Sequence, residues 1–123
     1  MREMTATLGG QELVLAATFK ASVEIANTVG DPLTIMREAA LESMFLDQGI
    51  PYEPKWRFTV TNVVQLIMIG LKAAGSTMKL DEVQDLVFSA GFLAGKEVAS
   101  NYLAQIAGPQ PKEVSDKGEA SGN

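Results

Sequence analysis

Cysteine and histidine are both absent from this chain of 123 residues. Their absence removes the thiolate nucleophile, the imidazole base that titrates near neutral pH, and the two side chains that most often bind transition metals. The sequence also lacks a glycine-rich phosphate loop ending in Gly-Lys-Ser/Thr, a Gly-x-Ser-x-Gly elbow and an Asp-rich calcium loop. We therefore expect a protein that is not an enzyme and has no cofactor and no metal site.

Positive charge is scarce as well. The 10 Lys and Arg residues stand against 15 Asp and Glu residues, which gives a net charge of −5. The basic residues do not cluster in the sequence. Because nucleic-acid binders depend on a basic surface that neutralises phosphates, we expect no nucleic-acid partner.

Long hydrophobic runs are missing too. The longest apolar stretch, from Val63 to Ala74, is interrupted by Gln65 and Lys72, whereas a helix that spans a bilayer needs about 20 apolar residues. The first residues, Met-Arg-Glu-Met-Thr-Ala-Thr, lack the apolar segment of a signal peptide. We therefore expect a soluble, intracellular protein with no membrane partner.

The order of sequence patterns predicts an α+β fold that is mostly α. A short N-terminal β-hairpin, with strands at Met4–Leu8 and Gln11–Leu15 around Gly9-Gly10, precedes a compact bundle of about four helices. Residues 1–107 form one domain in this prediction, and the polar residues 108–123 form a disordered tail. Since two strands alone are marginally stable, the hairpin must lie on helices or pair with further strands, and its outer edge is a candidate contact site.

Start and stop signals divide the middle of the chain into helices. Thr18 is expected to cap the first helix and Gly30 to end it, and Asp31-Pro32 is a strong start signal for the second. The third helix is apolar around most of its circumference, which predicts a place either in the middle of the bundle or in an assembly interface. The four predicted helices span residues 18–30, 32–48, 60–74 and 80–106, with Thr59 or Thr61 capping the third and Asp81 the fourth.

Helical spacing assigns an apolar side to each of the first two helices. These sides consist of Phe19, Ser22, Val23 and Ala26, and of Leu33, Met36, Ala40, Leu41, Met44 and Phe45. In the linker that follows, Tyr52 and Trp56 either form an aromatic ledge for a peptide or, as we expect, hold the loop against its own core. Carboxylates one turn apart, such as Glu38 and Glu42, are expected on a solvated face.

The fourth predicted helix is unusual because it has two apolar sides. The first side consists of Val83, Leu86, Val87, Ala90, Ala94, Val98 and Ile106, and the second of Phe88, Phe92, Gly95, Ala99 and Leu103. A small domain normally offers one core. Either this helix is central and buried, or its second side binds another chain.

Gly91 and Gly95 lie one turn apart on this predicted helix, where each glycine costs about 1 kcal/mol relative to alanine. They either let another protein approach closely, with Phe88 and Phe92 as anchors, or pack on the chain's own helix near Gly70 and Ala73. The candidate protein-interaction site consists of Phe88, Gly91, Phe92, Gly95, Ala99 and Leu103.

The order of four segments resembles a known family. They are Thr5–Leu15, the helix at Thr18–Gly30, the run Val63-Val-Gln-Leu-Ile-Met-Ile-Gly-Leu-Lys-Ala-Ala-Gly75, and the last helix opening Leu80-Asp-Glu-Val. Together these segments, which cover residues 4–108, are similar to the small tail assembly chaperones of long-tailed phages and gene transfer agents.

The resemblance implies a non-enzymatic chaperone that coats the tape measure protein before tail tube subunits polymerise around it. Such a protein acts in the bacterial host cytoplasm, self-associates, can meet the tail tube protein and is absent from the mature particle. Two alternatives stay open at this point. One is a structural tail tube or other tail subunit, although a tube lumen is usually built from more strand. The other is a generic helical adaptor that self-associates.

Overall fold

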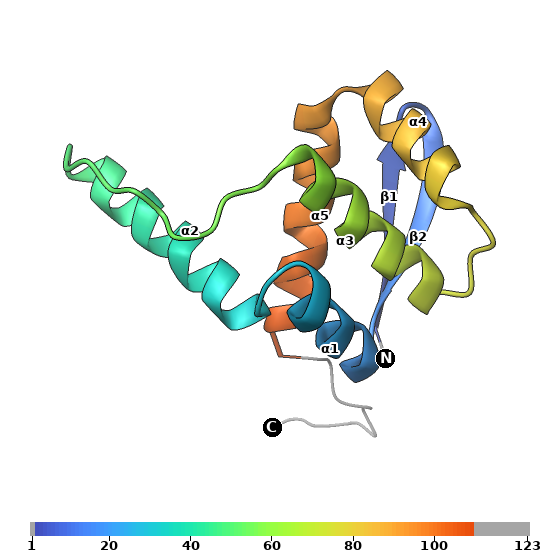
Figure 1. Ribbon diagram of the computed structural model, residues 1–123, viewed down its shortest axis with the longest axis horizontal. Coiled ribbons are helices and arrows are strands. Elements are labelled where there is room, and N and C mark those ends of the chain that lie inside the picture. Colours follow the sequence, from blue (N-terminus) through green and yellow to red (C-terminus); the bar gives the residue numbers. More distant parts are fainter. Residues whose placement is uncertain (1, 110–123) are drawn as a thin grey trace, which may run out of the picture.

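A two-stranded hairpin and five helices make up residues 2–109, the part of the chain that this computed structural model describes (Figure 1). The elements are β1 (Arg2–Leu8), β2 (Gln11–Ala17), α1 (Phe19–Thr28), α2 (Pro32–Asp47), α3 (Val60–Ala73), α4 (Leu80–Ala90) and α5 (Phe92–Ala107). The predicted α+β fold, mostly α with an N-terminal hairpin, is thereby confirmed, with five helices in place of about four. Apart from Gly108 and Pro109, the predicted tail lies outside the described residues.

The hairpin turns at the predicted glycine pair. Gly9 and Gly10 have φ values of 59° and 79°, a conformation that glycine adopts without the steric cost of a Cβ. The strands pair antiparallel without interruption, from Leu8 opposite Gln11 to Arg2 opposite Ala17. Both strands are therefore longer at their open end than the sequence predicts.

Side-chain caps begin three of the helices as expected. Thr18, Asp31 and Thr59 accept hydrogen bonds from backbone N–H groups three residues later, at 2.9, 3.1 and 3.0 Å. The prediction for the fourth cap was wrong by two residues. α4 starts after Lys79, whose N–H donates to Glu82 Oε1 at 2.7 Å, and Asp81 lies in the first turn.

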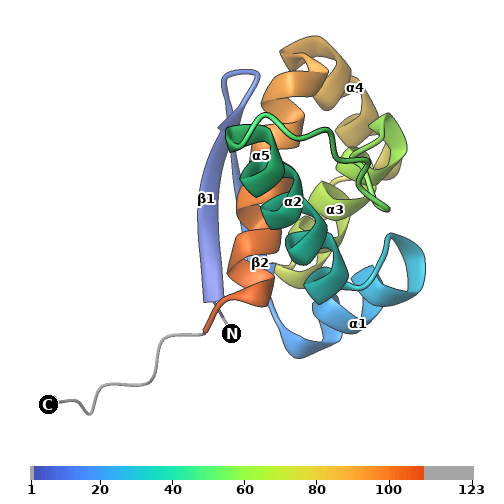
Figure 2. The ribbon, with the colours of Figure 1, turned by 90° about the vertical axis from the view of Figure 1, so that its left-hand side faces the viewer.

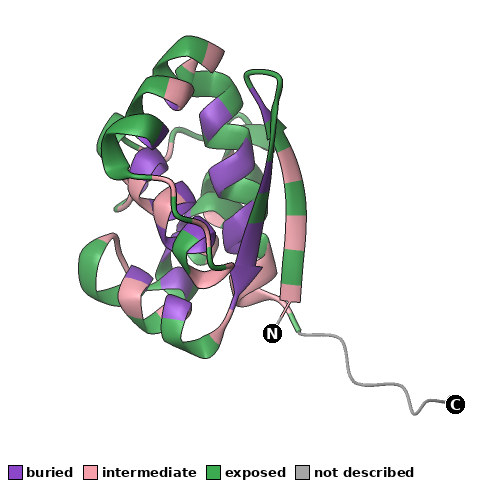
Figure 3. Cartoon of the chain, turned by 90° about the vertical axis from the view of Figure 1, so that its right-hand side faces the viewer, coloured by how far each residue is buried: buried purple, intermediate pink, exposed green. Residues whose placement is uncertain are grey.

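The core is built around α3, which packs against β2, α5, α1 and α4 (Figure 2). Half of its residues are buried, consistent with its predicted central place. Gly70 lets this helix lie directly on Leu15 of β2. The largest fully buried side chains are Tyr102, Leu8, Leu15, Ile25, Ile35, Leu66, Ile67 and Leu103. Burial alternates along β1, whereas β2 is more deeply covered and is buried on both faces at its end, over Leu15, Ala16 and Ala17 (Figure 3).

The apolar side predicted for α1 is the outward one. Ala21 and Ile25 are buried, whereas Phe19 is 85% exposed and Val23 is also exposed. Both pairs have the spacing of one helical turn, so periodicity alone could not choose between them. The position of α3 decides which pair lies inward.

α2 is attached to the rest of the molecule by its first half. Its buried residues are Pro32, Ile35 and Glu38, while Leu33, Met44 and Leu46 of the predicted helix are exposed. Figure 1 shows the second half of α2 and the chain that returns from it extending away from the other elements. The predicted apolar side of α2 therefore does not form one core-facing stripe.

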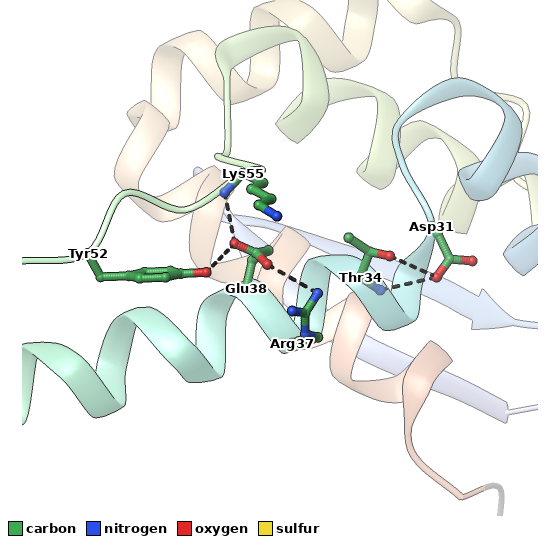
Figure 4. A network of polar contacts seen from close by, with 6 residues as sticks. All are labelled: Asp31, Thr34, Arg37, Glu38, Tyr52 and Lys55. Carbon is green, nitrogen blue, oxygen red and sulfur yellow. Dashed lines mark hydrogen bonds and ion pairs between the residues drawn. The ribbon is translucent and has the colours of Figure 1, made fainter.

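The buried carboxylate of Glu38 corrects the expectation of a solvated face. Its side chain is 1% exposed, and its Oε1 accepts hydrogen bonds from the Tyr52 hydroxyl at 2.7 Å and from the Lys55 backbone N–H at 2.8 Å (Figure 4). Arg37 lies 3.6 Å from Oε2. The hydrogen bonds from Lys55 and Tyr52 hold the pKa of Glu38 below its ordinary value.

Aromatic contacts also attach the loop between α2 and α3. The Tyr52 ring stacks on Phe45 of α2 with centroids 5.1 Å apart, and Trp56 Nε1 donates to the Val29 carbonyl at 3.2 Å. Tyr52 and Trp56 thus hold the loop on its own chain, which confirms the interpretation we preferred.

Glu38→Gln is expected to destabilise the protein at neutral pH, and the difference from the wild type should shrink in acid. Because the folded-state pKa of Glu38 is lowered, its stabilising effect is present above the unfolded-state pKa and is lost as the pH falls through the folded-state pKa. Urea unfolding of both proteins from pH 7 to pH 3 measures this gap. Glu42→Gln, on an exposed residue one turn later, serves as the control. A gap that stays constant with pH would contradict the role of the Glu38 carboxylate.

Candidate protein-binding groove

Gly91 breaks the long helix that the sequence predicts. Its φ of 101° lies outside the helical region, so α4 ends at Ala90 and α5 begins at Phe92. The Gly91 N–H still donates to the Val87 carbonyl at 2.9 Å, and its own carbonyl accepts from Gly95 N–H at 3.1 Å. The prediction of one continuous helix over residues 80–106 was therefore wrong. A glycine can occupy this conformation at little cost, which explains the residue at this position.

The break separates the six residues of the predicted interaction site. Gly95, Ala99 and Leu103 are buried inside the chain's own core. A Cβ at Gly95 would lie 3.0 Å from Val87 and 3.1 Å from Val63, so this glycine lets α5 approach α3 and α4. The expectation that Gly95, Ala99 and Leu103 belong to an outward surface is corrected, because α3 covers that side of α5. The neighbour is the chain's own helix, at its first half rather than near Gly70.

Phe88 and Phe92 remain at the surface. Phe88 is 72% exposed and Phe92 is 38% exposed, and their rings meet edge to face with centroids 5.8 Å apart. They come from the last turn of α4 and the first residue of α5, and they stay neighbours across the break at Gly91, as residues four apart would be on a continuous helix. Contiguous exposed apolar surface of this kind can mark a protein-interaction site.

The two phenylalanines border a groove between α3 and α4. The groove has a volume of about 420 Å³. Val60 and Leu80, each about half exposed, supply further apolar surface where α3 and α4 begin. The groove is lined by Val60, Thr61, Val64, Gln65, Leu80, Gln84, Asp85, Phe88 and Phe92. Leu93, at the start of α5, is 83% exposed next to Phe92.

The exposure of Val60, Leu80 and Leu93 was not predicted from the sequence. Each stands in the first turn of a helix, where a side chain can project beyond the neighbouring helix instead of facing it. Their signal in the sequence is weak, because an apolar residue at a helix start fits a core position equally well. Only the crossing of α3 and α4 places Val60 and Leu80 in one groove.

The groove offers binding surface and few reactive groups. Asp85 is the one charged residue in its lining, and the other polar residues there are Thr61, Gln65 and Gln84. Asp81 lies one turn before Asp85 on α4, so the rim is acidic on that side. Within residues 2–109, no group of three or more His, Cys, Asp or Glu side chains is arranged to hold a metal ion. The same residues contain no helix long and apolar enough to cross a membrane.

Comparisons of the chain with protein-family models, with curated proteins and with solved structures found no match. The interpretation of the groove accordingly rests on the residues that line it and on the resemblance described above.

Proposed function

We propose that this protein is a non-enzymatic binding protein whose groove between α3 and α4 receives an apolar helix of another protein. More particularly, we propose a tail assembly chaperone whose client is the tape measure protein. The observation that carries the proposal is the exposed Phe88–Phe92 pair at the end of the groove. The similarity in segment order to phage tail assembly chaperones supplies the identity of the client.

The proposed binding is driven by the apolar surface of the groove, which the chain alone leaves in contact with water. Burying a largely exposed phenylalanine contributes about 1.5–3 kcal/mol, and Phe88 is free to make that contribution only when a partner covers it. A groove flanked by two helices fits the apolar face of a third, as in other helix-in-groove complexes. Val60, Leu80 and Phe88 then contact the apolar face of the client.

The acidic rim adds a preference for charge. Asp81 and Asp85 lie on the α4 side of the groove, and the whole chain has a net charge of −5. A client helix with lysine or arginine beside its apolar face complements this rim. The same negative charge favours solubility of the coated client.

The proportion of helix supports a chaperone over a tail tube subunit. Residues 2–109 contain one sheet of two strands, whereas a tube lumen is usually built from sheet. In the proposed role, the protein coats the tape measure in the bacterial host cytoplasm, is displaced as tube subunits polymerise, and is absent from the finished particle.

Phe88→Asp is expected to weaken binding to a tape measure protein at least tenfold while the fold is retained, because the substitution places a charge where the client would bury an aromatic ring. Co-expression with a candidate tape measure protein, followed by size-exclusion chromatography with light scattering and a titration, measures the complex. Phe19→Asp is the matched control, since Phe19 is even more exposed than Phe88 but lies on α1, outside the groove.

The outcomes of this experiment distinguish between the candidate functions. A soluble complex that depends on Phe88 but not on Phe19 supports the chaperone and its groove. A complex that is indifferent to Phe88→Asp places the client elsewhere. A protein that ignores the tape measure and forms long polymers is a tail subunit, and one that does neither is a different kind of adaptor.

A further inference from the structure

The outer edge of β1 is a row of backbone groups that the described chain leaves unpaired. β1 pairs on one side with β2, and the sheet within residues 2–109 ends there. None of the backbone hydrogen bonds recorded outside the regular elements involves a residue of β1. Figure 2 shows β1 at the rim of the molecule, with α3 on the opposite side of α5, and Figure 3 shows the same strand from the other side.

The register identifies which groups point outward. In a hairpin with a two-residue turn, the residues that flank the turn, here Leu8 and Gln11, form a hydrogen-bonded pair, and such pairs alternate along the ladder. The N–H and C=O groups of Leu8, Ala6 and Met4 are therefore directed at β2. Those of Glu3, Thr5 and Thr7 are directed away from it, toward the open edge.

β1 has little that protects this edge from another strand, since its only charged residues are Arg2 and Glu3 at its first two positions. Natural edge strands are usually short, or carry a proline, an exposed lysine or a bulge that prevents pairing. β1 is seven residues long, pairs without a bulge, and has no proline and no lysine. From Met4 to its end at Leu8 the strand has no charged residue. An edge with this length and composition is suited to strand addition.

We propose that the β1 edge is a self-association site, at which β1 pairs antiparallel with β1 of a second copy to form a four-stranded sheet. With Thr5 opposite Thr5 of the second copy, the outward-directed groups of Glu3 meet those of Thr7. This arrangement has two-fold symmetry, so one surface serves both partners.

The side chains fit this register on both faces. On the outer face, threonine lies opposite threonine at the centre, a favourable cross-strand pair, and Glu3 faces the neutral Thr7 instead of another Glu3. On the inner face, Met4 lies opposite Ala6 of the second copy. Both are only half-buried in the single chain, whereas Leu13 and Leu15, their partners on β2, are buried. The second copy thus covers apolar surface that one chain leaves open.

The site is separate from the proposed client groove. The groove is formed by α3, α4 and the first residue of α5, and none of its lining residues belongs to β1 or β2. Self-association through β1 therefore leaves the groove accessible in both copies. The proposal does not depend on the identity of the client.

Thr5→Pro tests the edge directly. Proline removes the outward N–H at the centre of the proposed pair, and proline is tolerated in edge strands because that N–H is not used in the hairpin. We expect the wild type to dimerise with rising concentration in light scattering, and the substitution to raise the dimer dissociation constant at least tenfold. In the wild-type dimer, the amide protons of Thr5 and Thr7 should become protected from exchange. In a mixture of isotope-labelled and unlabelled chains, Met4 Hα should contact Ala6 Hα of the other copy.

Val14→Lys is the matched control. Val14 lies opposite Thr5 on β2 and is 40% exposed on the same face of the sheet, so its replacement adds a charge without altering the edge. Thr5→Lys, which places a lysine at the edge itself, should weaken the dimer as Thr5→Pro does. This second variant tests the edge even if the proline variant does not fold. A wild type that is monomeric at all concentrations overturns the proposal. So does a dimer that persists undiminished in both Thr5 variants, or a wild-type dimer in which the Thr5 and Thr7 amides stay unprotected.

Discussion

Tyr102→Ala should lower the free energy of unfolding by about 3–5 kcal/mol, the range for removing a large buried ring. Tyr102 on α5 is fully buried and is the largest such side chain in residues 2–109. Its hydroxyl donates to the Ala16 carbonyl of β2 at 2.8 Å, so one residue supplies both packing and a link between helix and sheet. Burial raises the pKa of the Tyr102 phenol well above its ordinary value, which keeps the hydroxyl protonated, and so a donor, into alkaline solution where an exposed tyrosine would ionise.

Urea unfolding followed by circular dichroism measures the loss of free energy of unfolding. A second variant, Tyr102→Phe, separates the contribution of the hydroxyl from that of the ring. Phenylalanine keeps the ring but leaves the buried Ala16 carbonyl without its donor, at an expected loss of about 1–3 kcal/mol. The further loss of free energy in Tyr102→Ala then measures the cost of the cavity that the missing ring leaves. If Tyr102→Ala proved no more damaging than Tyr102→Phe, the ring would not be packed as the structure has it.

Gly70→Ala should lower the free energy of unfolding by about 1–3 kcal/mol, the usual result of overpacking a core. Within a helix this exchange would otherwise stabilise by about 1 kcal/mol. The contact with β2 reverses the sign, because a Cβ on Gly70 would lie 2.6 Å from Leu15 Cδ2 and 2.9 Å from Leu15 Cβ. Leu15 is itself fully buried and has no open space into which to move.

A double-mutant cycle with Leu15→Ala tests the cause of this loss. In the wild type, Leu15→Ala should cost about 2–5 kcal/mol. In the Gly70→Ala background it should cost less, because the shortened side chain relieves the contact. The free energies come from the same urea measurements on four proteins. Strict additivity would mean that Gly70→Ala acts through something other than Leu15.

The parts of the fold that the sequence predicted well are those governed by local chemistry. Gly9-Gly10 specifies a tight turn, and Thr18, Thr59 and Asp31-Pro32 specify helix starts through hydrogen bonds to nearby N–H groups. These interactions involve residues only two or three positions apart. They form in the same way whatever the rest of the chain does.

The parts that were not predicted depend on contacts between distant segments. Gly91 is compatible with a helix interior and with a positive φ, and the apolar spacing continues across it almost in phase. On α1, the choice of Ala21 and Ile25 over Phe19 and Val23 depends on where α3 lies. Glu38 is buried because a loop 14 to 17 residues further along supplies its donors.

The candidate groove depends partly on local sequence patterns and partly on contacts between distant segments. The sequence identified Phe88 and Phe92 as surface anchors from their place on a second apolar side, and they are exposed as that hypothesis requires. The same reasoning assigned Ala99 and Leu103 to the surface, and it failed because the break at Gly91 turns their part of the chain onto α3. The groove itself needs the crossing of two helices, which no local pattern encodes.

The attachment of α2 by its first half has a consequence for the unfolding behaviour of the protein. Beyond Glu38, the helix and the returning chain are held chiefly by each other, through the Phe45–Tyr52 stack and the Glu38 hydrogen bonds. Opening this segment therefore exposes little of the core around α3, and its free energy is smaller than that of global unfolding. We expect the outer half of α2 and the returning chain to open at a lower free energy than the rest of residues 2–109, so that this segment can detach while the sheet and the groove stay folded.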